Sequence, residues 1–203
     1  GLKVYTTFYP LYDFTKKIAG DKAYVENIVP VGAQPHDFEP TPKAIVKLYD
    51  AGIFVFLGEP MDPWAKKIEA QLKNKGVVVV EAGEGLIQNN DPHIWLDPIM
   101  AKQISRRICN ALVQADAANK DYYESNLIDL EARFDELDAK YQTLAQMPQR
   151  DIITSHDFLG YLAKRYNLNS IAITGLSPQS QPSGNKMREI ATLAKEKKIK
   201  TIF

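Results

Sequence analysis

The sequence contains three histidines, and their positions make them the leading candidates for chemistry. His36, His93 and His156 each lie in a loop that follows an expected strand and precedes an expected helix, and none falls inside an apolar pattern. Taken singly, each could be an ordinary surface or capping histidine. Three imidazoles delivered to one edge match a metal site with three nitrogen ligands and a fourth position that is open or held by a carboxylate, as in many zinc sites. Together the three side chains therefore favour a single metal site.

His156 is also expected to be uncharged. It follows the strand that begins at Asp151 and is placed at the N-terminus of the next expected helix. The partial positive charge of a helix N-terminus disfavours imidazolium. We therefore expect a neutral ring that can offer a lone pair to a cation.

Other chemical motifs are absent or have the wrong spacing. The sequence has no glycine-rich phosphate-binding motif, no HExxH zinc motif and no GxSxG nucleophile motif. Ser155, His156 and Asp157 have the residue types of a catalytic triad, but adjacent side chains diverge and cannot form a relay. Cys109 is the only cysteine, which excludes an internal disulfide, and its apolar neighbours predict a packing role.

Composition narrows the class of partner. The 203 residues include 25 basic and 25 acidic side chains, so the formal charge is zero and nucleic acid is not an expected partner. Hydrophobic residues make up 45% of the chain, which supplies a real core. No apolar run approaches the roughly 18 residues that a membrane-spanning helix needs.

Alternating strands and helices are predicted ahead of residue 119. The expected strands are Leu2–Phe8, Tyr24–Pro30, Ile53–Gly58 and Val77–Ala82, and the expected helices are Pro10–Ala19, Pro42–Asp50, Asp62–Asn74 and Pro98–Ala115. Helices of this length allow right-handed crossovers between parallel strands. The valine run from Val77 to Val80 fits a strand that is buried on both faces.

A long amphipathic helix is predicted from Asn119 to Met147. Its apolar residues recur in steps of four and three, and Pro148 ends it. They are Tyr123, Leu127, Leu130, Phe134, Leu137, Tyr141 and Leu144. About 28 residues give a rod roughly 40 Å long, which could join two lobes or pack in a coiled coil or bundle. The strands expected on both sides favour the joining role.

A second α/β unit is predicted after the long helix. Its expected strands are Asp151–Thr154, Ser170–Thr174 and Lys200–Phe203, and its expected helices are Phe158–Tyr166 and Asn185–Lys197. The predicted fold class is therefore α/β, with two lobes of parallel sheet flanked by helices and joined by one long rigid helix. The predicted domains are 1–118, 119–147 and 148–203. Three strands make a marginal sheet, so we expect the second lobe to be incomplete.

Four segments resemble one known family, the zinc and manganese solute-binding proteins of bacterial ABC transporters, of the ZnuA and TroA type. The segments span nearly the whole chain and keep the family's order; they are 35–42, 91–98, 155–161 and the pair 175–177 and 181–183. The resemblance implies two α/β lobes on a rigid helix, a metal held in the cleft between them, and delivery of that metal to a membrane permease.

The resemblance also assigns roles to residues. It places His36, His93 and His156 on the first three ligand positions, and it implies a fourth ligand, usually an aspartate, that we expect beyond residue 203. Two departures from the family's pattern count against zinc. Zinc-type members often carry an acidic residue where this chain has Pro35, and a histidine-rich loop where it has only 88–90. Manganese-type relatives usually have glutamate at the position of His156, and imidazole suits zinc better than manganese. We therefore expect Zn²⁺, with Mn²⁺ as the alternative.

The expected function is capture of a divalent metal and its delivery to the permease of an ABC transporter. On this hypothesis the protein is not an enzyme, is a monomer, and is periplasmic or lipid-anchored on the outer face of the cytoplasmic membrane. Without a glycine or proline hinge in the long helix, loading should tilt the lobes only slightly. Two alternatives remain: a metallohydrolase that uses Asp37, Glu39 or Asp157 as general base, and a non-metal solute-binding or adhesive module.

Overall fold

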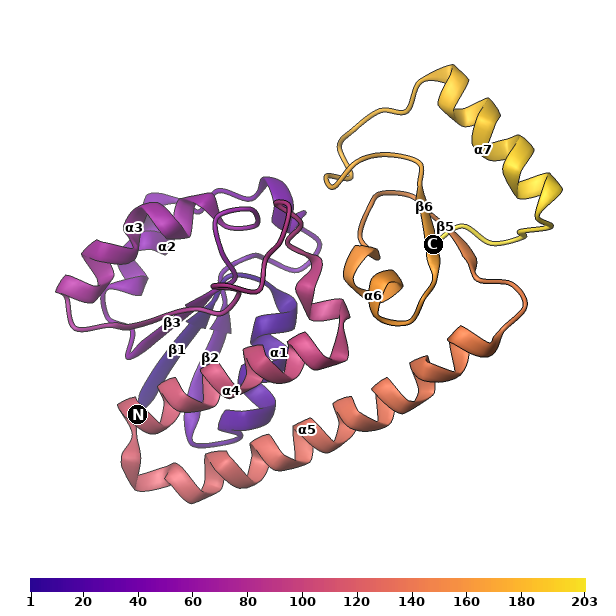
Figure 1. Cartoon of the computed structure of the whole chain (residues 1–203). Coiled ribbons are helices and arrows are strands. Elements are labelled where there is room, and N and C mark those ends of the chain that lie inside the picture. The colour runs from indigo at the N-terminus through magenta and orange to yellow at the C-terminus, as the bar shows by residue number, and fades with distance from the viewer.

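The first part of the chain forms a four-stranded parallel sheet between two layers of helices (Figure 1). The computed structural model describes all residues, 1–203. The strands are β1 (Leu2–Thr6), β2 (Ala23–Asn27), β3 (Ile53–Phe56) and β4 (Val78–Glu81), in the order β2-β1-β3-β4. Their connecting helices are α1 (Tyr9–Ala19), α2 (Pro42–Leu48) and α3 (Pro63–Asn74), and α4 (Pro98–Ala115) follows β4. The predicted crossover topology is confirmed.

Alternation along β3 divides the core between the two faces of this sheet. Ile53 and Val55 point into one cluster, which also contains buried residues of α1, α4 and the long helix α5 (Lys120–Gln142). Phe54 and Phe56 point into the other, which contains Trp64 of α3. A central strand buried on both faces is what a parallel sheet covered by helices requires.

Two of the connecting helices begin with the same device. The Thr41 side chain accepts a hydrogen bond from the Ala44 N–H (3.3 Å), and Pro42 occupies the first turn of α2. The Asp97 side chain accepts from the N–H groups of Ile99 (2.9 Å) and Met100 (3.3 Å) at the start of α4. A capping side chain followed by proline satisfies amide groups that a helix start otherwise leaves free, so both loops end at fixed points.

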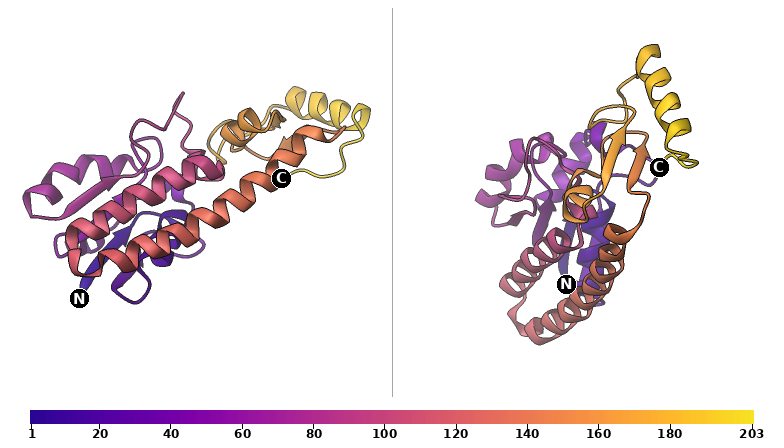
Figure 2. Two further views of the ribbon diagram at one scale, coloured as in Figure 1. Left: turned by 60° about the horizontal axis from the view of Figure 1, so that its bottom comes forward. Right: turned by 45° about the vertical axis from the view of Figure 1, so that its right-hand side comes forward.

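α5 leads from the first lobe to the second, as Figure 2 shows. At 1.5 Å per residue it is about 34 Å long, and a 3₁₀ turn at Thr143–Gln146 extends it. Tyr123 and Leu130 are buried against the first lobe, whereas Leu137 is exposed. Beyond it, the Tyr166 hydroxyl of the second lobe donates to Asp138 (2.7 Å). The helix therefore touches a different lobe with each half.

The second lobe contains a two-stranded parallel sheet of β5 (Asp151–Thr154) and β6 (Asn169–Ala172). Its helices are α6 (Gly160–Arg165) and α7 (Gly184–Glu196). The predicted third strand at 200–203 is not formed as a strand: only Ile202 makes a parallel bridge, to Ile153. The prediction that the valine run is buried on both faces is wrong. The valines of β4 are half-buried, because β4 is an edge strand.

None of the helices combines the length and the apolar character that crossing a bilayer requires.

Candidate metal centre

The three histidines lie in loops that follow strands, at the carboxyl ends of the two parallel sheets. His36 is in a 3₁₀ turn, Pro35–Asp37, between β2 and α2. His93 begins another, His93–Leu96, between β4 and α4. His156 follows β5 in the second lobe. Carboxyl ends of parallel strands are the usual place for ligands in such sheets, and here two sheets contribute to one place.

The three rings converge. One ligand nitrogen from each of His36, His93 and His156 lies within 4.8 Å of the others. The ring centroids are 5.2 Å apart for His36 and His93, 5.9 Å for His36 and His156, and 5.4 Å for His93 and His156. Tetrahedral zinc with bonds of about 2.0–2.1 Å places its ligand nitrogens about 3.3 Å apart. Small side-chain movements therefore separate this arrangement from a zinc-binding one.

The hollow around the rings is largely apolar. It has a volume of about 290 Å³, and its wall includes Phe8, Met61, Trp95, Leu96 and Phe158. The ring of Phe158 is 4.8 Å from that of His156, and the ring of Trp95 is 5.3 Å from that of His93. Apart from the three histidines, Gln34 is the polar residue of this wall.

His93 has a fixed hydrogen-bonding state. Its Nδ1 lies 2.6 Å from a carboxylate oxygen of Asp91, which can only accept. In the neutral ring Nδ1 therefore carries the proton, and Nε2 has the lone pair. That Nε2 is buried and has no hydrogen-bond partner. An unpartnered buried nitrogen beside two other imidazoles is the donor that a metal ion needs, and a carboxylate behind a histidine ligand is a common supporting group.

The pKa values of the other two rings, His36 and His156, are lowered, which favours the neutral form that binds a cation. Burial lowers the pKa of His36, and the neighbouring imidazoles of His93 and His156 lower it further. Burial, and then His93, lower the pKa of His156. Neutral rings result, as predicted for His156, but the predicted cause is wrong. α6 begins only at Gly160, after a bend that contains His156, so the ring does not sit on the helix N-terminus.

Sequence reasoning missed the supporting residue Asp91. A carboxylate two positions before a candidate ligand is a local signal that could have identified it.

The sequence also gave no sign that Asp62 is buried, next to Met61 in the wall of the histidine hollow. Asp62 is 1% exposed, and its carboxylate accepts a hydrogen bond from the Leu57 N–H (2.7 Å). Burial raises its pKa to about 7.

Two other candidate sites carry no such chemistry. Cys109 is buried, and burial raises the pKa of its thiol to about 11, which confirms the predicted packing role.

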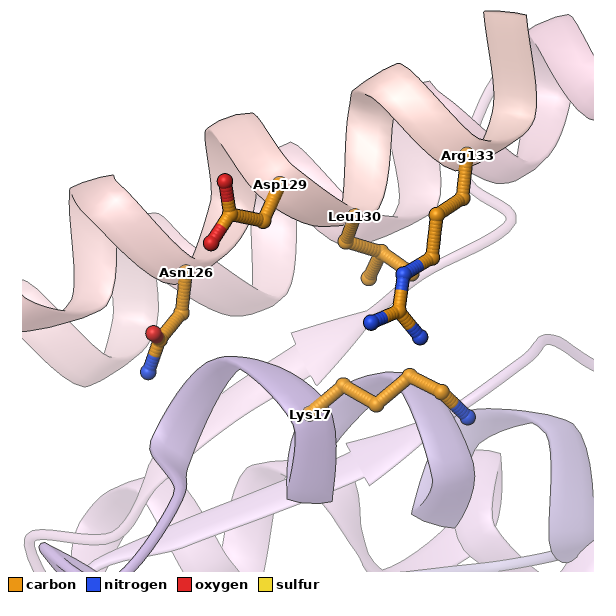
Figure 3. Close-up of a pocket in the computed structure, with 5 residues that line it drawn as sticks. All are labelled: Lys17, Asn126, Asp129, Leu130 and Arg133. Atoms are coloured by element: carbon orange, nitrogen blue, oxygen red, sulfur yellow. The ribbon is translucent and has the colours of Figure 1, made fainter. Parts of the chain in front are cut away.

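A hollow of about 130 Å³ lies between α1 and α5 (Figure 3). Its lining is mainly charged and shares no residue with the histidine hollow; it comprises Lys17, Asn126, Asp129, Leu130 and Arg133.

Comparison with known proteins gives a consistent result. The family model described as "ZnuA: Zinc-uptake complex component A periplasmic" matches residues 4–203. The chain is 37% identical to the high-affinity zinc uptake system protein ZnuA of Bacillus subtilis, covering all of this chain and 70% of that protein. It is 34% identical to the zinc-binding lipoprotein AdcA of Streptococcus pneumoniae, of which it spans 44%. The crystal structure of the Zn(II)-bound ZnuA-like domain of Streptococcus pneumoniae AdcA superposes with a TM-score of 0.87 at 35% identity, covering 99% of this chain and 77% of that one.

Proposed function

Because the chain belongs to the ZnuA family of periplasmic zinc-uptake components, we propose that it captures Zn²⁺ with His36, His93 and His156 and delivers it to the permease of an ABC transporter. The observation that carries this proposal is the convergence of three imidazole nitrogens, each from a different loop, within 4.8 Å. Three imidazoles suit zinc, whereas manganese prefers oxygen ligands. They leave the fourth tetrahedral position to a water or a carboxylate.

The architecture supports reversible capture. We propose that the chain works as two lobes, 1–118 and 148–203, carried by the rod 119–147. His36 and His93 come from the first and His156 from the second, so a bound cation would tie the lobes together. α5 contains neither glycine nor proline, and loading should therefore tilt the lobes slightly rather than close them widely.

The alternatives have less support. The family consists of solute-binding transport components, and the relatives are named for zinc uptake and zinc binding. The family description is periplasmic and one relative is named a lipoprotein, so we place this protein outside the cytoplasmic membrane. We also propose that it acts as a monomer. The group of ligand atoms that lie within 4.8 Å of one another contains no carboxylate, so Asp37, Glu39 and Asp157 are not among the candidate ligands.

Calorimetric titration with zinc tests the proposal. Wild-type protein should bind one Zn²⁺ per chain more tightly than micromolar, and Mn²⁺ more weakly. A structural zinc site with four ligands contributes about 10–16 kcal/mol, so one ligand is worth about 3–4 kcal/mol, and each single histidine-to-alanine variant should lose about 10²–10³-fold in affinity.

Glu39→Gln is the matched control, because it changes an exposed side chain of the His36 loop and leaves all three imidazoles in place. It should bind zinc like the wild type. Zinc binding that survives His93→Ala or His156→Ala unchanged would refute the assignment, and so would a wild type that binds no transition metal.

A further inference from the structure

We propose that helix α6 of the second lobe positions the metal-binding ring of His93, with Asp91 as the intermediate. In this arrangement Tyr161 bonds to the backbone of Asp91, Gly160 leaves room for the Asp91 carboxylate, and Asp91 bonds to His93. The inference rests on the proposed function only for its consequence for zinc affinity. We call Gly160, Tyr161, Asp91 and His93 the α6 clasp.

The inner contact of the α6 clasp lies within one loop. One oxygen of the Asp91 carboxylate accepts from both the backbone N–H (3.1 Å) and the ring Nδ1 (2.6 Å) of His93. Two hydrogen bonds from one residue fix both the position and the rotation of the ring. They also select the tautomer whose free nitrogen, Nε2, is the one left without a partner.

The second oxygen of Asp91 lies against the start of α6. A Cβ atom added at Gly160 would be 2.9 Å from this oxygen. Real Cβ atoms do not approach other atoms so closely, so the absence of a side chain at Gly160 lets the carboxylate lie there. The first residue of α6 is thus shaped around a side chain of the other lobe.

Tyr161 holds the backbone of the same loop. Its hydroxyl donates to the Asp91 carbonyl (2.5 Å) and accepts from the Gln88 N–H (2.8 Å). Between these two residues the chain makes a tight turn with Asn89 and Asn90 at φ 51° and 62°. Tyr161 is 8% exposed, and its hydroxyl bonds to both ends of the turn.

Arg165 gives α6 a second contact with the segment that carries His93. It lies four residues after Tyr161, on the same face of the helix. Its Nε is 2.7 Å from both carboxylate oxygens of Asp97, which also caps α4. The segment that carries His93 is therefore held by the second lobe before and after the histidine. A ring that belongs to the first lobe by sequence is oriented by the second.

Loss of such supporting contacts typically lowers metal affinity about 10–100-fold, because the ring can then rotate or change tautomer. Tyr161→Phe removes the hydroxyl and keeps the ring that packs in the core. Tyr166→Phe is the matched control, since it removes a tyrosine hydroxyl of the same lobe that bonds to Asp138 of α5 and not to the α6 clasp.

The test combines ¹⁵N NMR of the histidine rings in metal-free protein at pH 8 with calorimetric zinc titration. In the wild type and in Tyr166→Phe, His93 should be the Nδ1–H tautomer. In Tyr161→Phe, signals of the other tautomer should appear and the dissociation constant for zinc should rise about tenfold or more. Gly160→Ala should have the same effect if it folds.

A wild-type His93 tautomer and wild-type affinity in Tyr161→Phe would overturn the inference. An equal loss of affinity in Tyr166→Phe would overturn it as well, since the effect would then be a general loosening of the lobe. The tautomer is read without metal, so a wild type that binds no zinc would refute the proposed function while the NMR comparison still decides the α6 clasp.

Discussion

Buried Asp62 should make the stability of this protein fall as pH rises from about 4 to about 7. The carboxylate is 1% exposed, beside the wall of the histidine hollow, and its pKa is raised from 3.8 to about 7 because burial penalises the charged form. In the unfolded chain the group loses its proton near pH 3.8. Between the two values the folded state holds a proton that the unfolded state does not, so the free energy of unfolding decreases with rising pH.

The magnitude follows from the shift. Each pKa unit corresponds to about 1.4 kcal/mol, and a shift of about three units gives a ceiling of about 4 kcal/mol between pH 4 and pH 8. Asp62→Asn has no proton to lose and keeps an oxygen that can accept from the Leu57 N–H. The stability of the variant relative to wild type should therefore improve by about 2–4 kcal/mol over this range.

Urea unfolding at pH 4, 6 and 8 measures this difference directly. Asp50→Asn, at an exposed position, is the matched control for the chemical change, and the quantity to compare is the difference between the two variants. A difference that stays constant with pH, or that grows as the pH is lowered, would refute the reasoning about the buried carboxylate.

Two further predictions concern the metal centre and the sheet beside it. Burial and neighbouring imidazoles hold the pKa of His36 and His156 below 6.5, so zinc affinity measured by calorimetry should be nearly constant from pH 8 to 6.5. Below that it should fall by up to about tenfold per pH unit for each ring, and a fall that begins well above pH 6.5 would contradict the structure. Gly83→Ala should lower the free energy of unfolding by about 1–3 kcal/mol, because the new Cβ would be 2.6 Å from the Leu57 carbonyl, which already accepts the Gly83 N–H. Gly184→Ala, whose Cβ would meet nothing nearer than 3.8 Å, is its control, and equal stability of the two variants would count against the packing argument.

Helices and strands were predicted well where the apolar pattern of the side chains ends at the same residues as capping or proline signals. The helix from Pro98 to Ala115 and the strand from Asp151 to Thr154 have the predicted bounds. The convergence of the histidines also followed from local reasoning, since each lies in a loop after a parallel strand. The loops that carry the candidate metal centre could thus be located before any contact was known.

Strand order and contacts between distant residues could not be predicted in the same way. The valines of β4 have the composition of a fully buried strand, yet β4 is an edge strand because order in a sheet depends on packing of the whole lobe. The apolar pattern of the long helix is continuous, but Leu137 is exposed where the helix leaves the first lobe. Tyr161 and Asp91 are 70 residues apart in sequence, and no periodicity links them.

The two-sided attachment of α5 makes it a lever. Beyond the buried Leu130, α5 still contacts the first lobe through Phe134, whose ring is 5.3 Å from that of Phe14, and through Asp135, which pairs with Lys102 of α4. The arm that leaves the first lobe therefore runs from Asp135 to Gln142, about 10 Å. Pivoting such an arm by about 5° displaces its tip by about 0.9 Å. Because His36 and His93 both lie in the first lobe and only His156 lies in the second, such a pivot changes only the distances from His156 to the other two rings. A bend too small to alter the outline of the molecule would therefore still be felt at the one ring that the second lobe contributes.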